Sequence, residues 1–405
     1  MKKTLFVLLA FAVLFTVFSC SNGGGGGGNS PNDNNNDNDI TAEKYYESPK
    51  APGSPRPFND KSALEFVAGI KIGWNLGNTL DANADWLPKN APVSDFEKAW
   101  VGIVTTQANI TAVKNAGFNA IRIPVSWTKC ADNNYIIRKD WMDRVTEIVN
   151  YAVNNDMYII LNTHHDENVF KFKNADKAAA IKTFKIIWEQ IAFNFKNYGE
   201  KLIFEALNEP RTPGSENEWN GGTSEERVNL NEYYRAFVEV VRKSGGNNGK
   251  RFIMLNPYAA SGSNTAMNAL VIPNDTAQDK VIVSFHSYSP YNFALNTEGT
   301  DVWDESKASD KTDITNSMDA YKAKFIDKGI PVIIGEFGAV HKNNTAARTA
   351  WAKFYVREAK KRGIPCFWWD NHSFSGDGEL FGLLKRSDNS FPFQEIIDAL
   401  MDGIK

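Results

Sequence analysis

Two glutamates, Glu209 and Glu336, each follow a short apolar run and are the residues best suited to chemistry in this chain. Glu209 lies in the run EALNEP (residues 205–210), and Glu336 lies in IIGEFG (residues 333–338). Carboxyl groups can act as nucleophiles and as acid or base catalysts. Taken singly, Glu209 could be an ordinary loop carboxylate and Glu336 a helix-capping acid, so their meaning depends on whether the fold brings them together.

Several other apolar runs also end in polar, charged or aromatic residues. These are Arg122, the segment His164, His165 and Asp166, the pair His286 and Tyr288, and Trp369. In an α/β barrel the carboxyl ends of the strands form the face that carries the active site. The repeated placement of such residues after strand-like runs predicts one shared site at that face.

The elements that would position these residues alternate along the chain. Short apolar runs typical of buried strands alternate with longer stretches that carry apolar residues at helical spacing, which indicates parallel βαβ units. The predicted strands are 69–76, 118–124, 157–162, 202–207, 252–256, 281–286, 331–336 and 365–370, and the predicted helices are 110–116, 141–154, 178–198, 226–243, 317–328 and 345–362. We predict an α/β fold of the (β/α)8 TIM-barrel type in a single catalytic domain. A doubly wound open sheet shares the same alternation.

Glu209 and Glu336 follow the fourth and seventh predicted strands, so a closed barrel would place them across one mouth. A retaining glycosidase needs two carboxyl groups about 5–5.5 Å apart, one as nucleophile and one as acid and later base. The residues therefore favour glycoside hydrolysis. A role as nucleophile for Glu336 requires an ionised carboxylate, which Arg122 and Tyr288 could support, whereas burial and the charge of Glu336 would keep Glu209 protonated.

The histidines also allow a metal hypothesis, in which His164, His165, His286 and Asp166 form a ligand set. The cluster lacks the helical two-histidine spacing of zinc hydrolases, and adjacent histidines at a strand end tend to point apart. We therefore predict no metal and no cofactor, and expect these histidines to bind sugar or support a carboxylate.

These motifs resemble glycoside hydrolase family 5, the cellulase-type group of retaining barrel enzymes, over nearly all of residues 58–405. The resemblance implies that Glu209 is the acid/base and Glu336 the nucleophile. The family's supporting residues match Arg122, His164, Asn208, His286, Tyr288 and Trp369. Trp368 is adjacent to Trp369, so the match there could be off by one residue. His165 is a further substrate-binding candidate. Asn208 is placed to bind the sugar 2-hydroxyl.

The opening run IGWNLGNTLD (residues 72–81) resembles the subgroup that attacks cellulose, mixed-linkage β-glucan and xyloglucan. The resemblance thus implies a secreted endo-β-1,4-glucanase that works by double displacement on a β-glucan polysaccharide. Two alternatives remain: an endo-β-mannanase on the same barrel, and a non-catalytic surface lipoprotein that binds glycans.

Composition limits the other functional classes. The chain has 405 residues and a formal net charge of -3, and no long basic run follows its first three residues. A nucleic-acid partner is therefore excluded, since its phosphate backbone calls for clustered positive charge. We expect a monomer whose partner is its polysaccharide substrate.

The N-terminus predicts export. Lys2 and Lys3 precede an apolar run from Leu5 to Phe18, which is followed by Ser19 and Cys20. This pattern is typical of a signal peptide, and the small residue before cysteine favours a bacterial lipoprotein with Cys20 as the lipidated residue, although an ordinary secretory signal is the alternative.

The predicted domains are a lipoprotein signal peptide (1–19), a lipid-anchored low-complexity linker (20–57) and the catalytic barrel (58–405). The linker begins with glycine, asparagine and aspartate and becomes proline-rich. We predict attachment to the bacterial outer membrane by the lipid only, at the cell surface or at its periplasmic face.

Overall fold

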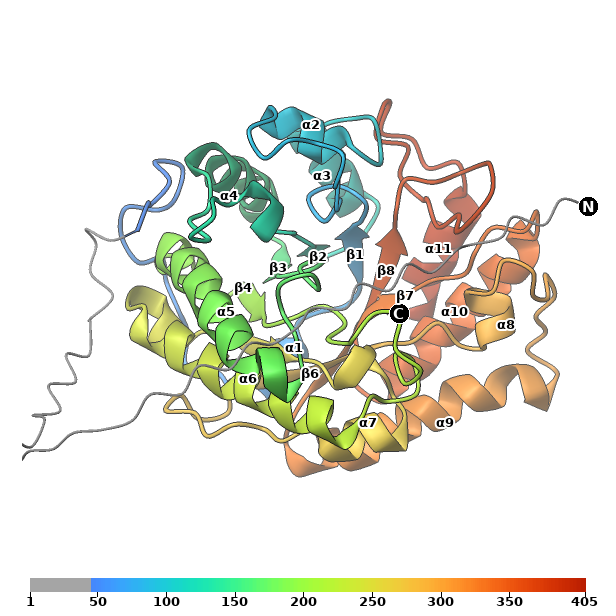
Figure 1. Cartoon of the computed structure of the whole chain (residues 1–405). Coiled ribbons are helices and arrows are strands. Elements are labelled where there is room, and N and C mark those ends of the chain that lie inside the picture. The colour runs from blue at the N-terminus through green and yellow to red at the C-terminus, as the bar shows by residue number, and fades with distance from the viewer. Residues whose placement is uncertain (1–44) are drawn as a thin grey trace, which may run out of the picture. The chain divides into compact units, whose positions relative to one another are not determined.

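Eight parallel strands close into one barrel in this computed structural model, which describes residues 45–405 (Figure 1). The strands are β1 (Gly73–Leu76), β2 (Ala120–Ile123), β3 (Tyr158–Asn162), β4 (Leu202–Glu205), β5 (Ile253–Leu255), β6 (Val281–His286), β7 (Val332–Phe337) and β8 (Cys366–Asp370). Pairing of β1 with β8 closes the ring, for example Gly73 opposite Phe367. The barrel prediction is confirmed, and the open sheet is excluded.

Helices surround the strands (Figure 1). They are α1 (Ala63–Val67), α2 (Val93–Lys98), α3 (Gln107–Asn115), α4 (Lys139–Asn154), α5 (Asn174–Phe195), α6 (Ser224–Lys243), α7 (Asn264–Ala269), α8 (Tyr291–Ala294), α9 (Ala308–Lys324), α10 (Thr345–Lys361) and α11 (Gln394–Gly403). The six predicted helices correspond to α3, α4, α5, α6, α9 and α10. Four of the unpredicted ones have only four to six residues, too short for a helical period to stand out.

An apolar layer fills the end of the barrel where the strands begin. Inward side chains from successive strands, including Ala120, Ile160 and Ile282, pack into one buried cluster with Phe66 of α1. Phe367 reaches into this layer across Gly73, where a Cβ atom would lie only 2.1 Å from the ring. Gly73 is therefore required by close approach, because any larger residue would displace the aromatic ring.

The next inward layer is polar, because side chains alternate along each strand. On β2 the inward Ala120 is followed two residues later by Arg122, and both are fully buried. A bulge in β7 changes this alternation: the register of β7 shifts against both β6 and β8 around Gly335 and Glu336. The bulge inserts one extra residue and turns Glu336 toward the barrel axis.

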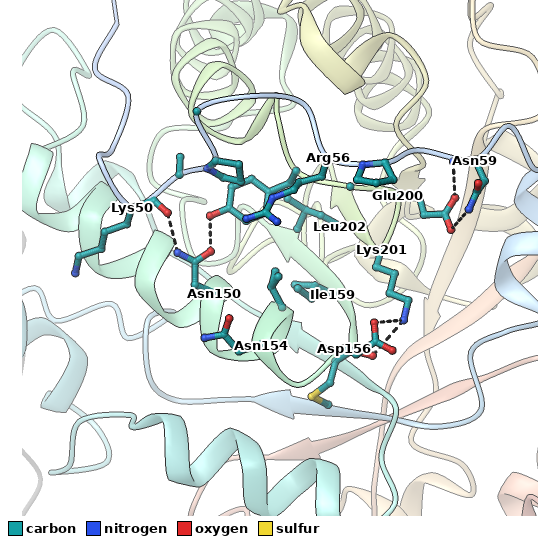
Figure 2. Close-up of a pocket in the computed structure, with 18 residues that line it drawn as sticks. Lys50, Arg56, Asn59, Asn150, Asn154, Asp156, Ile159, Glu200, Lys201 and Leu202 are labelled. Atoms are coloured by element: carbon teal, nitrogen blue, oxygen red, sulfur yellow. Dashed lines mark hydrogen bonds and ion pairs between the residues drawn. The ribbon is translucent and has the colours of Figure 1, made fainter.

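The stretch from residue 45 to residue 57, which the sequence placed in the linker, lies against the outer helices α4 and α5. Tyr46 donates a hydrogen bond to Asp143 (2.8 Å), and Asn194 accepts one from the backbone of Ser48 (2.8 Å). In Figure 2, Asn150 donates to the carbonyl of Lys50 (2.9 Å). This stretch is therefore not a freely extended spacer, because polar groups of its backbone form hydrogen bonds with the barrel.

This stretch roofs a cavity of about 700 Å³ at the amino end of the barrel beside the starts of β3 and β4 (Figure 2). Two pairs of its lining residues bind each other: Asn59 binds Glu200 (3.0 Å) and Lys201 binds Asp156 (2.6 Å). The strand-end residues singled out by the sequence all lie elsewhere. Size alone therefore does not mark the functional site.

The described residues test some of the remaining sequence predictions and not others. Cys130 and Cys366 are both buried free thiols. Within residues 45–405 no helix has both the length and the apolar character needed to cross a membrane. The signal peptide, Cys20 and residues 20–44 of the linker lie outside the described residues, so these predictions and the domain boundary at residue 58 stay predictions.

Candidate active site

The two glutamates meet at the carboxyl end of the barrel. Glu209 lies in the loop after β4 and Glu336 in β7, and a carboxylate oxygen of each lies within 4.8 Å of the other. This separation suits the retaining type of glycosidase, which needs about 5–5.5 Å between carboxyl groups, better than the inverting type, which needs about 6.5–9.5 Å. The arrangement can support a covalent double displacement.

Glu336 is held by two donors. Arg122 Nη1 lies 2.6 Å from its Oε1 atom, and the Tyr288 hydroxyl donates to Oε2 at 2.9 Å. Burial, followed by the charges of Glu336 and Glu209, raises the pKa of Tyr288 well above its ordinary value, so the phenol keeps its proton for donation. Both donors fix the carboxylate in one orientation.

Arg122 joins four strands or strand ends. Its guanidinium, fully buried, donates to Glu205 (2.7 Å), Asn75 (3.0 Å), Glu336 (2.6 Å) and Asn208 (2.7 Å). Burial lowers the pKa of Arg122, but the negative charges of Glu205 and Glu336 outweigh it and raise the pKa above its ordinary value. Glu205, which the sequence did not assign to the site, is the partner that lets this charge be buried.

Glu209 has different neighbours. Its Oε1 lies 2.8 Å from Nδ1 of His286, and its Oε2 lies 3.6 Å from Nη1 of Arg211. Burial raises the pKa of Glu209, but the hydrogen bond with His286 and the charge of Arg211 outweigh it and lower the pKa below its ordinary value. The sequence predicted the opposite direction, because it considered burial and Glu336 without these two partners.

His286 is placed to donate to Glu209. Its Nε2 atom is buried and has no hydrogen-bond partner among the described residues. A proton on Nε2 would therefore be left without an acceptor, which is costly in a buried site. The surroundings thus favour a proton on Nδ1, directed at the Glu209 carboxylate.

Asn208 presents its amide to the cavity. Its Oδ1 accepts from Arg122, and its backbone carbonyl accepts from Asn256 Nδ2 at 2.6 Å. Because the amide oxygen is engaged, the Nδ2 hydrogens are available to a ligand in the cavity that Asn208 lines. This orientation suits donation to a sugar hydroxyl.

Trp369 and the two adjacent histidines form another wall. Trp369 lies parallel to His164, with ring centroids 5.8 Å apart, while the neighbouring Trp368 is fully buried and turned outward. His165 bonds Glu167 at 3.2 Å. Burial and the nearby positive groups lower the pKa of His164 well below its ordinary value. The His164 ring is therefore neutral, and it can donate a hydrogen bond to a sugar or accept one from it.

The resulting cavity measures about 490 Å³. Seven of its lining residues were singled out by the sequence, namely His164, His165, Asn208, Glu209, Tyr288, Glu336 and Trp369. Five were not, namely Asn78, Leu295, Asn371, Ser373 and Glu379. Asn371 directly follows β8 and could have been found by its strand-end position, whereas Glu379 lies in a loop whose path no local pattern reveals.

Potential metal ligands do come together among the described residues. Glu209, His286 and Glu336 form one group of three, and Asp81, His164 and His165 another, each with ligand atoms within 4.8 Å. Glu336 in the first group already accepts from Arg122 and Tyr288. Asp166 is elsewhere, because it caps the backbone of Trp127 and Thr128. The absence of a metal stays a prediction.

A closed (β/α)8 barrel with two supported glutamates at its carboxyl end defines a retaining glycosidase. Comparison with known proteins agrees: residues 80–375 match the cellulase family, glycosyl hydrolase family 5. The chain therefore belongs to glycoside hydrolase family 5. It is an endoglucanase of that family, so the non-catalytic alternative is set aside.

Individual relatives are similar over most of the chain. Endoglucanase B of Ruminococcus albus is 45% identical over 360 residues, which cover 87% of this chain and 84% of the relative. A GH5-4 broad specificity endoglucanase from Ruminococcus champanellensis, solved with bound cellotriose, is 46% identical with a TM-score of 0.83, covering 85% of this chain and all of the other. A family 5 lichenase from Caldicellulosiruptor sp. F32, solved as a mutant in complex with cellotetraose, is 42% identical with a TM-score of 0.82, covering 87% of this chain and 98% of the other.

Replacing Tyr288 with Phe tests the support of Glu336. We expect kcat on β-glucan to fall by about 10- to 100-fold, because one hydrogen bond to a charged group contributes about 1.5–3 kcal/mol. Steady-state kinetics, with the melting temperature as a control for folding, provide the measurement. An unchanged kcat would show that the Tyr288 hydroxyl does not act on Glu336.

Proposed function

We propose that this endoglucanase has broad specificity and hydrolyses cellulose, mixed-linkage β-glucan and xyloglucan, with Glu336 as nucleophile and Glu209 as acid/base. The observation that carries these roles is the carboxylate pair within 4.8 Å, in which Glu336 accepts from Arg122 and Tyr288 while Glu209 contacts His286. The two environments give the two carboxyl groups different roles.

In the first step Glu336 Oε attacks the anomeric carbon while the glycosidic oxygen takes a proton from Glu209 and leaves. Sugar bound in the cavity excludes water, and this desolvation favours the protonated form of Glu209 that the step needs. In the second step Glu209, now ionised, takes a proton from water, whose oxygen attacks the anomeric carbon and releases Glu336. Asn208 donates to the 2-hydroxyl throughout.

The names of the similar proteins support a glucan substrate. The solved relatives include broad specificity endoglucanases and lichenases, with cellotriose or cellotetraose bound in two of them. Mannan is the alternative backbone, which differs from glucan in the orientation of the 2-hydroxyl. The Asn208 amide would donate to this hydroxyl and would therefore distinguish the two backbones. A comparison of activity on glucan and on mannan tests the glucan assignment.

A substrate panel tests the proposed specificity. Purified protein spanning residues 45–405 keeps the stretch docked on α4 and α5, and we expect it to release reducing ends from carboxymethyl cellulose, mixed-linkage β-glucan and xyloglucan. We expect much slower release from xylan and mannan. A mannan rate equal to or above the glucan rates would overturn the glucan assignment in favour of a mannanase.

Replacing each glutamate with Ala separates the two roles. Glu336→Ala should reduce turnover of every substrate to background, since no nucleophile remains. Glu209→Ala should slow glucan cleavage by about 100-fold or more but spare aryl cellobiosides with good leaving groups, because only the former need an acid. Equal damage to both substrate types by Glu209→Ala would contradict its role as acid.

We also propose that the chain is exported and attached to the outer membrane by a lipid on Cys20, at the cell surface. The motif before Cys20 and the glycine-rich segment after it support this proposal. A long polysaccharide is too large for ready entry into the periplasm, which favours the outer face.

Cys20→Ala tests the anchor. We expect the variant to be lost from the outer-membrane fraction, because in the proposal the lipid on Cys20 is what attaches the chain there. Cell fractionation with immunoblotting measures this, and protease treatment of intact cells reports the membrane face. Retention of Cys20→Ala in the outer-membrane fraction would contradict lipidation at this residue.

A further inference from the structure

Arg211, two residues after Glu209, lies at the centre of a charged cluster that the catalytic scheme above does not use. Its Nε donates to Glu218 (3.0 Å), and its Nη1 donates to Glu167 (3.2 Å) and to the backbone carbonyl of Glu209 (3.1 Å). The guanidinium also lies over the Trp219 ring, 4.8 Å from its centroid. These contacts fix the position of the charge independently of the Glu209 carboxylate.

From this position Arg211 faces the acid/base directly. Its Nη1 lies 3.6 Å from Glu209 Oε2, the oxygen that His286 does not bind. The Arg211 side chain is only 13% exposed, so water screens the interaction weakly. A fixed, poorly screened positive charge beside a carboxyl group stabilises its ionised form.

We propose that Arg211 is a positioning residue that holds Glu209 and, through its charge, sets the pH above which Glu209 ceases to act as an acid. Glu167 and Glu218 hold the guanidinium in place and partly offset its charge. This inference rests on the proposed acid/base role of Glu209.

Several other ionisable groups also face Glu209. They are His165 from the loop after β3, His286 and Tyr288 from β6 and its end, Glu336 from β7 and Glu379 from the loop after β8. Glu336 and Glu379 oppose ionisation of Glu209, whereas the two histidines favour it. Arg211 differs from all of them because its charge is present over the whole working range.

The consequence is a balance between the two steps of catalysis. The first step needs Glu209 protonated, and the second needs it ionised. A charge that favours ionisation moves the working range toward acid and helps the second step there. The lowered pKa of Glu209, which burial alone would raise, agrees with this direction.

The test compares the pH dependence of kcat/KM for four variants: Arg211→Met, Arg211→Lys, Glu218→Gln and the control Arg235→Met. The substrates are a cello-oligosaccharide, which needs the acid, and an aryl cellobioside with a good leaving group, which does not. Arg235 is an exposed arginine on α6, 60% exposed, and its removal matches the change in net charge.

For the cello-oligosaccharide, the fall in kcat/KM at high pH reports ionisation of Glu209 in the free enzyme. Arg211→Met removes a positive charge, so Glu209 keeps its proton longer and the fall should move up by about one pH unit. Glu218→Gln removes an offsetting negative charge, so the fall should move down. For Arg211→Lys the fall should stay near the pH at which it occurs in the parent enzyme, and for Arg235→Met it should coincide with that pH.

A merely structural role for Arg211 would lower the rate without moving the pH profile. Unmoved profiles in Arg211→Met and Glu218→Gln, or shifts of the same sign in both, would therefore overturn the proposal. Melting temperatures identify misfolded variants, and Glu218→Gln tests the same charge if Arg211→Met does not fold. Failure of the acid role itself would look different: the parent enzyme would then show the same high-pH fall with both substrates.

Discussion

The burial of one arginine charge organises the catalytic end of this barrel. Arg122 has no contact with water, and it is compensated by Glu205 and Glu336 while Asn75 and Asn208 accept its remaining hydrogen bonds. Removing one partner from such a buried ion pair costs about 3–5 kcal/mol, because the other charge remains unpaired. Glu336 is thus held in place by a buried ion pair that also joins β2, β4 and β7.

This polar layer is possible because an apolar layer fills the barrel beneath it. The inward cluster around Ile160, Ile282 and Phe367 excludes water from below and lowers the local dielectric. Hydrogen bonds and charges above it are correspondingly stronger, so Arg122, Tyr288 and Glu336 keep fixed positions before the substrate arrives. The site needs little rearrangement at the moment of reaction, which is the condition for electrostatic catalysis.

The two glutamates differ through their neighbours and not through their own chemistry. Glu336 faces a buried cation that the barrel requires, whereas Glu209 lies in a loop between His286 and the Arg211 cluster. Arg211 and its partners Glu167 and Glu218 lie in loops outside the strands, so they can vary with less effect on the barrel. The fold therefore constrains Glu336 more tightly than Glu209.

The local pattern of the chain was sufficient to predict the eight strands, six of the barrel helices and the residues that follow the strands. Apolar period and strand-end position are properties of neighbouring residues, so they can be read from the sequence. Closure of the barrel, the bulge that turns Glu336 inward, the pairing of Arg122 with Glu205 and the approach of Arg211 to Glu209 needed the tertiary structure. The first three depend on which distant segments meet, and the approach of Arg211 depends on how the loop after β4 folds. The direction of the Glu209 pKa followed from these contacts, because a carboxyl group responds to the positions of charges in space.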